Sequence, residues 1–213
     1  MLSSGIEKLD ELLGGGVDFG KIVLIETVVG IGDIIALNFV ADALRKDIKT
    51  FIILGRKRVK DVEEFLRKRE VDRSNLVVVT TSEKGDKRLN LDELFLISRT
   101  IKDLAQRSKF GYIDILQILL ILYDPRKIYS LFSDIISTLK DSEVMTVLTI
   151  DKRFTDERTL AMFEDLADVV IEIEEVVESL KVKRGIRIKK NCLLPPTDFY
   201  SLKIDKNGFR IED

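Results

Sequence analysis

The sequence has no histidine, no tryptophan and one cysteine among its 213 residues. Without histidine, the chain lacks a common metal ligand and the side chain that titrates near neutral pH, which excludes imidazole-based catalysis. One cysteine, Cys192, excludes an intramolecular disulfide and a cysteine-cluster metal site. Because Leu193 and Leu194 follow it, we expect Cys192 to be a packed small residue and not a reactive thiol.

Long apolar runs and a strong net charge are absent too. No apolar stretch reaches the length of a membrane span, and the N-terminus lacks the basic-then-apolar order of a signal peptide. The 35 basic and 37 acidic residues nearly cancel, so overall charge does not indicate a nucleic-acid binder. We expect a soluble cytoplasmic protein without membrane contact. A charge-rich composition with only 12 Gly and 3 Pro is compatible with a thermophilic source.

Strand and helix patterns alternate over residues 1–167. Apolar runs predict strands at 21–26, 50–54, 75–80, 110–115 and 144–150. Apolar periodicity predicts helices at 6–13, 33–46, 59–70, 89–108 and from 124 onwards. This alternation predicts an α/β fold with a mostly parallel sheet covered by helices on both faces.

The pattern changes over residues 168–213. Short apolar runs predict strands at 169–177, 181–190, 199–204 and 209–211, the last two joined through Asn207-Gly208, a strong hairpin signal. We expect these strands to finish the same sheet in antiparallel fashion. Because no linker or repeat interrupts the chain, residues 1–213 are expected to form a single domain.

The most informative segment reads KIVLIETVVGIGDIIALNF, an apolar strand, a glycine-containing turn and a helix. A phosphate-binding loop of pattern G-x-x-x-x-G-K-[ST] is expected in this context. Thr27 stands where the first glycine belongs, whereas Gly30 and Gly32 are kept. Asp33 occupies the lysine position and Ile34 the hydroxyl position. The scaffold is that of an ATPase, but the nucleotide site is degenerate.

An aspartate at position 33, in place of the lysine of a phosphate-binding loop, is unfavourable for nucleotide binding. A working loop needs the lysine to reach the phosphates and the hydroxyl to hold Mg²⁺. A carboxylate about 4 Å from a phosphate oxygen costs roughly 4 kcal/mol at an effective dielectric near 20, or about a thousandfold in affinity. Helix N-terminal amides still favour an anion, and we expect the Asp33 carboxylate to be that anion.

The opening SGIEKLDELLGGGVDFGKIVLIE resembles that of the archaeal RadA/KaiC-like branch of RecA-type ATPases. The resemblance extends from about Ser4 to the C-terminus and implies a RecA-like P-loop fold. Asp114, which follows the apolar Phe110–Ile113, falls at the family's Walker B position. The chain is also similar to small proteins of hyperthermophilic archaea that look like eroded members of this family.

Two further departures from the family concern catalysis and assembly. Arg56 and Lys57 stand where the family carries a glutamate pair that activates the attacking water. Lys189-Lys190-Asn191 stands where a Lys-x-Arg reaches the nucleotide of a neighbouring subunit, so only the first basic residue survives. The resemblance therefore implies an inactive homologue, not an enzyme, without a resident cofactor or metal. Asp114 is either a surviving Mg²⁺ ligand or a polar residue at a strand end.

Two basic stretches are candidate nucleic-acid contacts. The first follows the second predicted strand and contains Arg56, Lys57, Arg58 and Lys60. The second is Lys181–Lys190. Each also has a simpler interpretation, the first as the solvated start of a helix and the second as a strand paired with the acidic residues before it, Glu172, Glu174, Glu175 and Glu178.

An apolar run continues beyond the strand that should end at Asp114. Residues 115–123 read ILQILLILY, and together with the preceding strand this apolar run is longer than an ordinary buried strand. It is either a longer strand or buried helix start, or an exposed surface for a partner. The partner-binding residues of the second interpretation are Ile115, Leu119, Leu120, Ile121 and Leu122.

Three functions follow from these patterns. The leading hypothesis is a non-catalytic module that binds a protein or peptide partner, either itself or an active KaiC/RadA-like relative. The second is a sensor that binds ATP weakly without hydrolysis, through loop amides around Gly30 and Gly32 and through Asp114. The third is an accessory DNA-binding protein that uses the two basic stretches.

Overall fold

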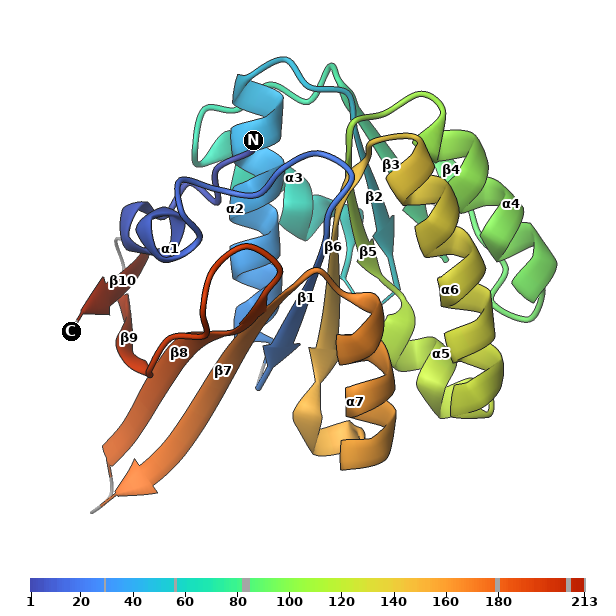
Figure 1. The fold of residues 1–213 in the computed structure, drawn as a ribbon. Coiled ribbons are helices and arrows are strands. Elements are labelled where there is room, and N and C mark those ends of the chain that lie inside the picture. The colour runs from blue at the N-terminus through green and yellow to red at the C-terminus, as the bar shows by residue number, and fades with distance from the viewer. Residues whose placement is uncertain (29, 56, 82–84, 179–180, 206–207, 213) are drawn as a thin grey trace.

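The computed structural model describes residues 1–28, 30–55, 57–81, 85–178, 181–205 and 208–212. Within these ranges the chain forms one continuous sheet of ten strands, with helices packed on both of its faces (Figure 1). The sheet therefore unites residues 1–167 with residues 168–213.

Seven strands form the parallel part of the sheet. They are β1 (Ile22–Thr27), β2 (Thr50–Leu54), β3 (Leu76–Thr80), β4 (Lys87–Arg88), β5 (Phe110–Asp114), β6 (Met145–Asp151) and β7 (Val169–Glu178). Three antiparallel strands follow, β8 (Lys181–Asn191), β9 (Tyr200–Asp205) and β10 (Gly208–Glu212). The spatial order is β10-β9-β8-β7-β1-β6-β5-β2-β3-β4, which confirms a mostly parallel sheet with an antiparallel end. Asn207 of the expected hairpin turn lies outside the described residues.

The helices are divided between the two faces (Figure 1). One face carries α1 (Glu7–Leu12), α2 (Ile31–Arg45) and α3 (Val59–Arg67). The other carries α4 (Leu94–Ala105), α5 (Leu116–Leu122), α6 (Pro125–Asp141) and α7 (Glu157–Leu166). A 3₁₀ turn, η1 (Lys152–Phe154), connects β6 to α7. No helix in the described ranges is long and apolar enough to cross a membrane.

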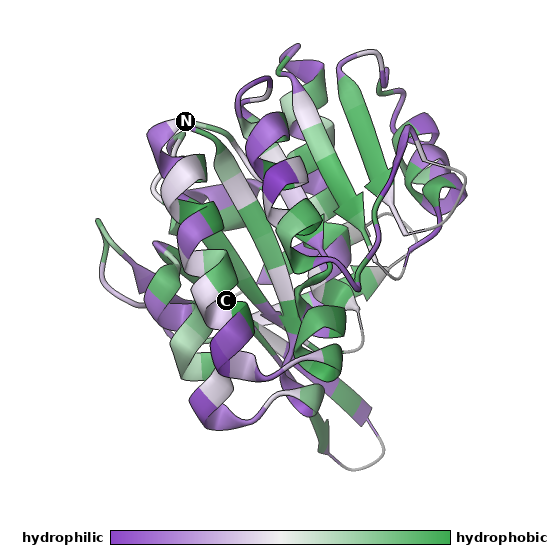
Figure 2. Ribbon diagram, turned by 90° about the vertical axis from the view of Figure 1, so that its right-hand side faces the viewer, coloured by the Kyte–Doolittle hydropathy of each residue, from purple (hydrophilic) through white to green (hydrophobic). Residues whose placement is uncertain are grey.

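Side-chain alternation along the strands builds two hydrophobic cores. In β1, Val23 and Ile25 pack beneath α2, whereas Ile22 and Leu24 pack on the opposite face. Because both faces are covered, the central parallel strands are largely apolar, and Figure 2 shows them largely green between helices that alternate green and purple. All parallel strands end at one side of the sheet, which we call the C-terminal edge.

Two helices differ from the sequence prediction, and the segment after Asp114 agrees with one of its alternatives, a buried helix start. The helix expected from residue 89 begins at Leu94, because Asn90 accepts a hydrogen bond from the Asp92 amide and donates one to Glu93, which holds these residues in a turn. The apolar run after Asp114 turns into α5. Helix α7 was not predicted, although Asp156 caps it by accepting a hydrogen bond from the Thr159 amide.

Candidate functional site

The loop between β1 and α2 is closed by its own side chains. Gly30 has φ 71°, in the left-handed region that glycine adopts readily, and precedes the first turn of α2. The Gly32 amide donates a 2.7 Å hydrogen bond to Oγ1 of Thr27, the residue at the position of the missing first glycine. An amide at a helix N-terminus that could face a phosphate is thus already satisfied.

Asp33 lies in the first turn of α2 and has two partners from other elements. Its Oδ2 is 2.9 Å from Nζ of Lys57, in the loop after β2, and its Oδ1 accepts a 3.0 Å hydrogen bond from the Tyr112 hydroxyl on β5. The Asp33 and Lys57 side chains are 6% and 24% exposed, and Tyr112 is fully buried. The carboxylate therefore has internal partners, which we did not predict.

Tyr112 acts as a hydrogen-bond donor in this cluster. Burial, followed by the negative charges of Asp114 and Asp33, holds the pKa of Tyr112 well above its ordinary range. A phenol with a raised pKa keeps its proton near neutral pH and donates it to Asp33.

Asp114 ends β5 at the C-terminal edge and is 2% exposed. Its Oδ1 accepts a hydrogen bond of 3.5 Å from the Thr149 hydroxyl on β6. Ile34, at the position of the metal-binding hydroxyl, is half-buried and offers no oxygen ligand on its side chain. Across the ranges that the structure describes, no three His, Cys, Asp or Glu side chains gather closely enough to hold a metal ion.

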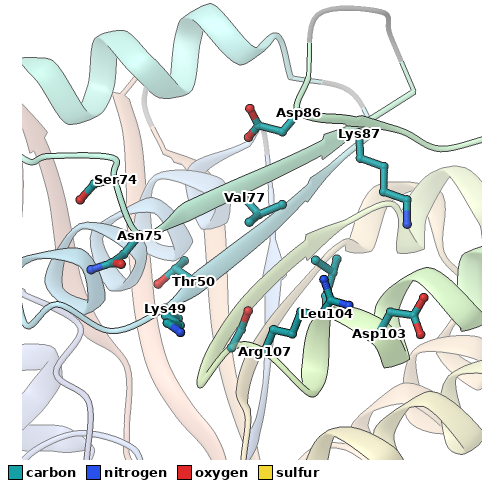
Figure 3. Close-up of a pocket in the computed structure, with 11 residues that line it drawn as sticks. Lys49, Thr50, Ser74, Asn75, Val77, Asp86, Lys87, Asp103, Leu104 and Arg107 are labelled. Carbon is teal, nitrogen blue, oxygen red and sulfur yellow. The ribbon is translucent and has the colours of Figure 1, made fainter.

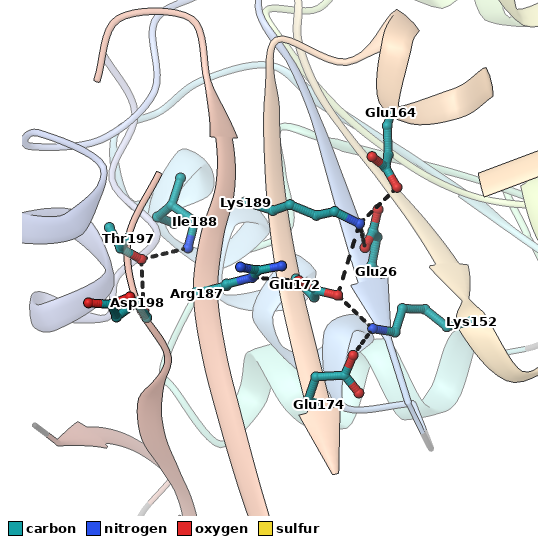
Figure 4. A network of polar contacts seen from close by, with 10 residues as sticks. All are labelled: Glu26, Lys152, Glu164, Glu172, Glu174, Arg187, Ile188, Lys189, Thr197 and Asp198. Carbon is teal, nitrogen blue, oxygen red and sulfur yellow. Dashed lines mark hydrogen bonds and ion pairs between the residues drawn. The ribbon is translucent and has the colours of Figure 1, made fainter. Parts of the chain in front are cut away.

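A second polar cluster lies beside β1, on the face that α7 covers (Figure 4). At its centre, Nζ of Lys189 is 2.9 Å from Glu164, 3.2 Å from the fully buried Glu26 and 4.0 Å from Glu172. Lys152 extends the cluster with ion pairs to Glu172 and Glu174. These contacts tie together elements β1, α7, β7, β8 and η1.

The pKa of the Glu26 carboxyl is raised in this cluster. Burial, reinforced by the hydrogen bond and the charge of Glu164, raises the pKa of Glu26 to about 8, against the opposing effect of Lys189. Lys189 donates to Oε2 of Glu26 and to Glu164, whereas Oε1 of Glu26 is buried and has no hydrogen-bond partner in the part of the chain that the structure describes.

The raised pKa of Glu26 predicts that stability falls as the pH rises. Because the pKa of Glu26 is raised from 4.5 to about 8 on folding, the folded state binds the proton more tightly. The contribution is complete below about pH 4.5 and is lost as the pH rises through about 8, at a cost of up to about 5 kcal/mol. We expect the melting temperature to fall over this window and Glu26→Gln to flatten the profile. An equally steep profile for Glu26→Gln would contradict the assignment.

Comparison with solved structures identifies the fold. A crystal structure of a KaiC-like protein from the hyperthermophilic archaeon Pyrococcus horikoshii matches 100% of this chain and 98% of that chain, with a TM-score of 0.78 and 23% sequence identity. The chain has the KaiC-like, RecA-type fold. No protein-family model and no curated protein matches the sequence. Because 537 chains of solved structures match, the KaiC-like fold alone does not select an activity.

Within the KaiC-like fold, Asp33 and Lys57 form a pair of reversed charge. The resemblance to RecA-type ATPases implied a lysine at the first position and a glutamate at the second. Here the carboxylate and the ammonium have changed places and bind one another at 2.9 Å. Arg56, the other residue of the glutamate-pair position, lies outside the described residues.

Lys189 differs from the role that the resemblance implied. The family's residue contacts the nucleotide of a neighbouring subunit, whereas Lys189 binds Glu26 and Glu164 of its own chain. Lys190 likewise turns back onto α7, where its Nζ donates to the main-chain oxygens of Glu164 and Asp165. Both ammonium groups are thus occupied within the chain.

The apolar run after Asp114 divides between core and surface. Ile115 and Leu119 are fully buried in the core beneath α5, so their assignment to a partner surface was wrong. Leu120 is partly buried against the same core, whereas Ile121 and Leu122 are 66% and 53% exposed. The helical period explains the division, because an amphipathic helix turns only one face to the sheet.

The basic strand Lys181–Lys190 pairs with the acidic strand before it, as predicted. In the β7–β8 ladder, Arg187 lies opposite Glu172 and Arg184 opposite Glu175, with ion pairs of 2.6 and 2.8 Å. In the first basic stretch, Lys57 binds Asp33 and the exposed Arg58 binds Asp61 of α3. Among the described residues of the two stretches, Lys57, Arg58, Arg184 and Arg187 are thus bound to acidic side chains of the same chain.

Cys192 is exposed, so the prediction that it is packed was wrong. It follows β8 and, with Leu193 and Leu194, lines a shallow cavity of about 160 Å³ against Gly14 and Gly16. The chain turns away from the sheet at this point, which leaves the thiol without a covering element.

The sequence contains two single-residue signals for the buried polar contacts of Glu26 and Tyr112. Glu26 is the one acidic residue within the apolar strand IVLIET, and an acidic side chain on a buried strand requires a partner. Tyr112 in FGYID gives a weaker signal of the same kind, because a buried phenol also needs a hydrogen-bond partner. Neither pattern names the partner.

Proposed function

We propose that this chain is a non-catalytic KaiC-like pseudo-ATPase that serves as a binding or assembly module for a protein partner. The observation that carries the proposal is the ion pair between Asp33 and Lys57. A triphosphate at this loop would face the Asp33 carboxylate and would have to displace Lys57 and the Thr27 hydroxyl from their present partners. Nucleotide binding would therefore begin by breaking favourable contacts.

The partner surface of the proposal is an apolar patch formed by Phe95, Ile121 and Leu122. Phe95, in the first turn of α4, is 74% exposed. The end of α5 lies beside the start of α4, because the Tyr123 hydroxyl donates a 2.9 Å hydrogen bond to the main-chain oxygen of Leu91. Three large apolar side chains thus project from neighbouring helix ends, an arrangement typical of protein interaction sites.

The other two hypotheses receive less support from the geometry. A weak ATP sensor needs free loop amides, and the Gly32 amide is bound to Thr27. A DNA-binding protein needs available cations, and those of Arg184 and Arg187 are paired with glutamates. The internal pairing of charges favours the protein-binding module.

The test is a thermal-shift titration with ATP, ADP and Mg²⁺ at millimolar concentrations. We expect no saturable rise in melting temperature for the natural sequence. A saturable rise would overturn the proposal in favour of the sensor. The informative control restores the family's charges with Asp33→Lys, Ile34→Thr and Lys57→Glu together. Asp33→Lys without Lys57→Glu would place two lysines face to face, so we expect the triple variant to bind ATP more tightly than Asp33→Lys with Ile34→Thr.

A further inference from the structure

A cavity of about 550 Å³ lies away from the nucleotide loop, at the side of the sheet where β2 and β3 begin. Strands β2 to β4 form one wall and the last turn of α4 forms another (Figure 3). Its volume is within the range of small-molecule sites, about 300–1,000 Å³. Neither the loop chemistry nor the apolar patch involves this cavity.

Three cations from three different elements line the cavity. Lys49 precedes β2, Lys87 lies on β4, and Arg107 follows α4. None of the three forms an ion pair with any residue that the structure describes. In Figure 3 the side chains of Lys87 and Arg107 both extend into the space between the strands and α4. What distinguishes these three cations is that they line one cavity.

The acidic residues of the cavity do not cancel this charge. Asp86 is engaged elsewhere, because Oδ2 accepts a 2.8 Å hydrogen bond from the Val78 amide and Oδ1 is 3.3 Å from Arg73. Asp103, exposed on α4, is the other acidic residue among those that line the cavity. Three cations against one available carboxylate leave the cavity positively charged.

Three further side chains give the cavity a polar contact and an apolar surface. Ser108 is 7% exposed, and its hydroxyl has no hydrogen-bond partner among the described residues. A serine hydroxyl at the wall of the cavity can donate a hydrogen bond to an anionic group. Val77 is 39% exposed in the middle of a strand whose neighbours are buried, and Leu104 of α4 lies across from it.

The spacing of the cations limits the ligand. Lys49 precedes Thr50, which pairs with Leu76, whereas Lys87 pairs with Val79. Their main chains are thus four residue steps apart along the strands, about 13 Å at about 3.3 Å per residue. Val77 lies between these two levels. A ligand that contacts both ends needs two separated negative groups joined by an apolar segment.

We propose that this cavity is a binding site for a small dianion, with Lys87 and Arg107 binding one anionic group, Lys49 the other, and Val77 with Leu104 contacting the apolar segment between them. The anionic groups are carboxylates or phosphates, which share this electrostatic recognition. The site is independent of the proposed partner patch on α4 and α5.

The experiment is calorimetric titration of the full chain with three probes at low ionic strength. Suberate carries two carboxylates on an apolar chain, octane diphosphonate carries two phosphonates, and octanoate carries a single carboxylate. We expect one of the dianions to bind saturably and octanoate to bind at least about tenfold more weakly, because it lacks one ion pair. Preference for suberate identifies a carboxylate ligand, and preference for the diphosphonate a phosphate ligand.

Matched variants separate the cavity from general surface charge. Arg107→Gln is expected to weaken binding of the preferred dianion about tenfold, whereas Arg99→Gln, an exposed arginine of α4 outside the cavity, leaves it unchanged. Ile121→Asp also leaves it unchanged, which distinguishes this site from the partner patch. Absence of saturable binding, octanoate binding as tight as the dianions, or equal effects of Arg107→Gln and Arg99→Gln would overturn the proposal.

Discussion

Asp33→Ala is expected to lower the free energy of unfolding by about 3–5 kcal/mol, as for other buried ion pairs that lose one partner. The substitution leaves the Lys57 ammonium without its 2.9 Å contact and the buried Tyr112 hydroxyl without the acceptor it now uses. Chemical denaturation followed by circular dichroism measures the loss.

A double-mutant cycle isolates the pair itself. Lys57→Met alone leaves the Asp33 carboxylate uncompensated in a nearly buried position, so it is also expected to destabilise. Asp33→Asn alone is the other single variant of the cycle. Asp33→Asn with Lys57→Met removes both charges and keeps an acceptor for Tyr112, and we expect it to recover most of the stability. If the losses of unfolding free energy in the two single variants simply add in the double variant, Asp33 and Lys57 are not coupled. The conclusion that their ion pair closes the loop between β1 and α2 would then be wrong.

Leu119→Asp is expected to destabilise the fold strongly and Ile121→Asp hardly at all, although the two residues lie two positions apart on α5. Leu119 is fully buried, so a carboxylate there costs more than about 4 kcal/mol and can prevent folding. Ile121 is 66% exposed, so Ile121→Asp changes the free energy of unfolding by less than about 0.5 kcal/mol. The contrast is measured by thermal denaturation of both variants.

Ile121→Asp also tests the apolar patch as an interface. A second copy of the chain is the first partner to examine, and light scattering over a range of concentrations reports its association. We expect association of the natural sequence and its loss in Ile121→Asp. Leu193→Asp is the matched control, because Leu193 is 73% exposed but lies beyond β8, and it should associate normally. Equal association of Ile121→Asp and Leu193→Asp would exclude the patch from self-assembly.

Much of the fold could be read from contiguous segments. The five apolar runs up to residue 150 correspond to β1, β2, β3, β5 and β6, because a covered parallel strand needs apolar residues on both faces. The pairing of the β7–β8 hairpin followed from the order of its charges, acidic residues first and basic residues second. Such features depend on residues close together in the chain.

The candidate site was predicted in position but not in contacts. Asp33 was located by the loop pattern, and its place at the start of a helix was expected. Its partner Tyr112 is 79 positions away and reaches it only because β5 is two strands from β1 in the sheet. The same applies to Lys189, whose partner Glu26 is 163 positions away.

The sequence by itself determined the alternating α/β pattern and the presence of Asp33 and Ile34 where a phosphate-binding loop carries a lysine and a hydroxyl, since periodicity and motif spacing are properties of neighbouring residues. Only the tertiary structure decided that Asp33 pairs with Lys57, that Leu119 is core while Ile121 is surface, and that three cations without an ion pair among the described residues line one cavity. Each depends on which distant segments the sheet order brings together and on how each helix is rotated against the sheet. That arrangement is determined by the burial of apolar side chains from many segments in a common core. It therefore cannot be predicted from any one segment alone.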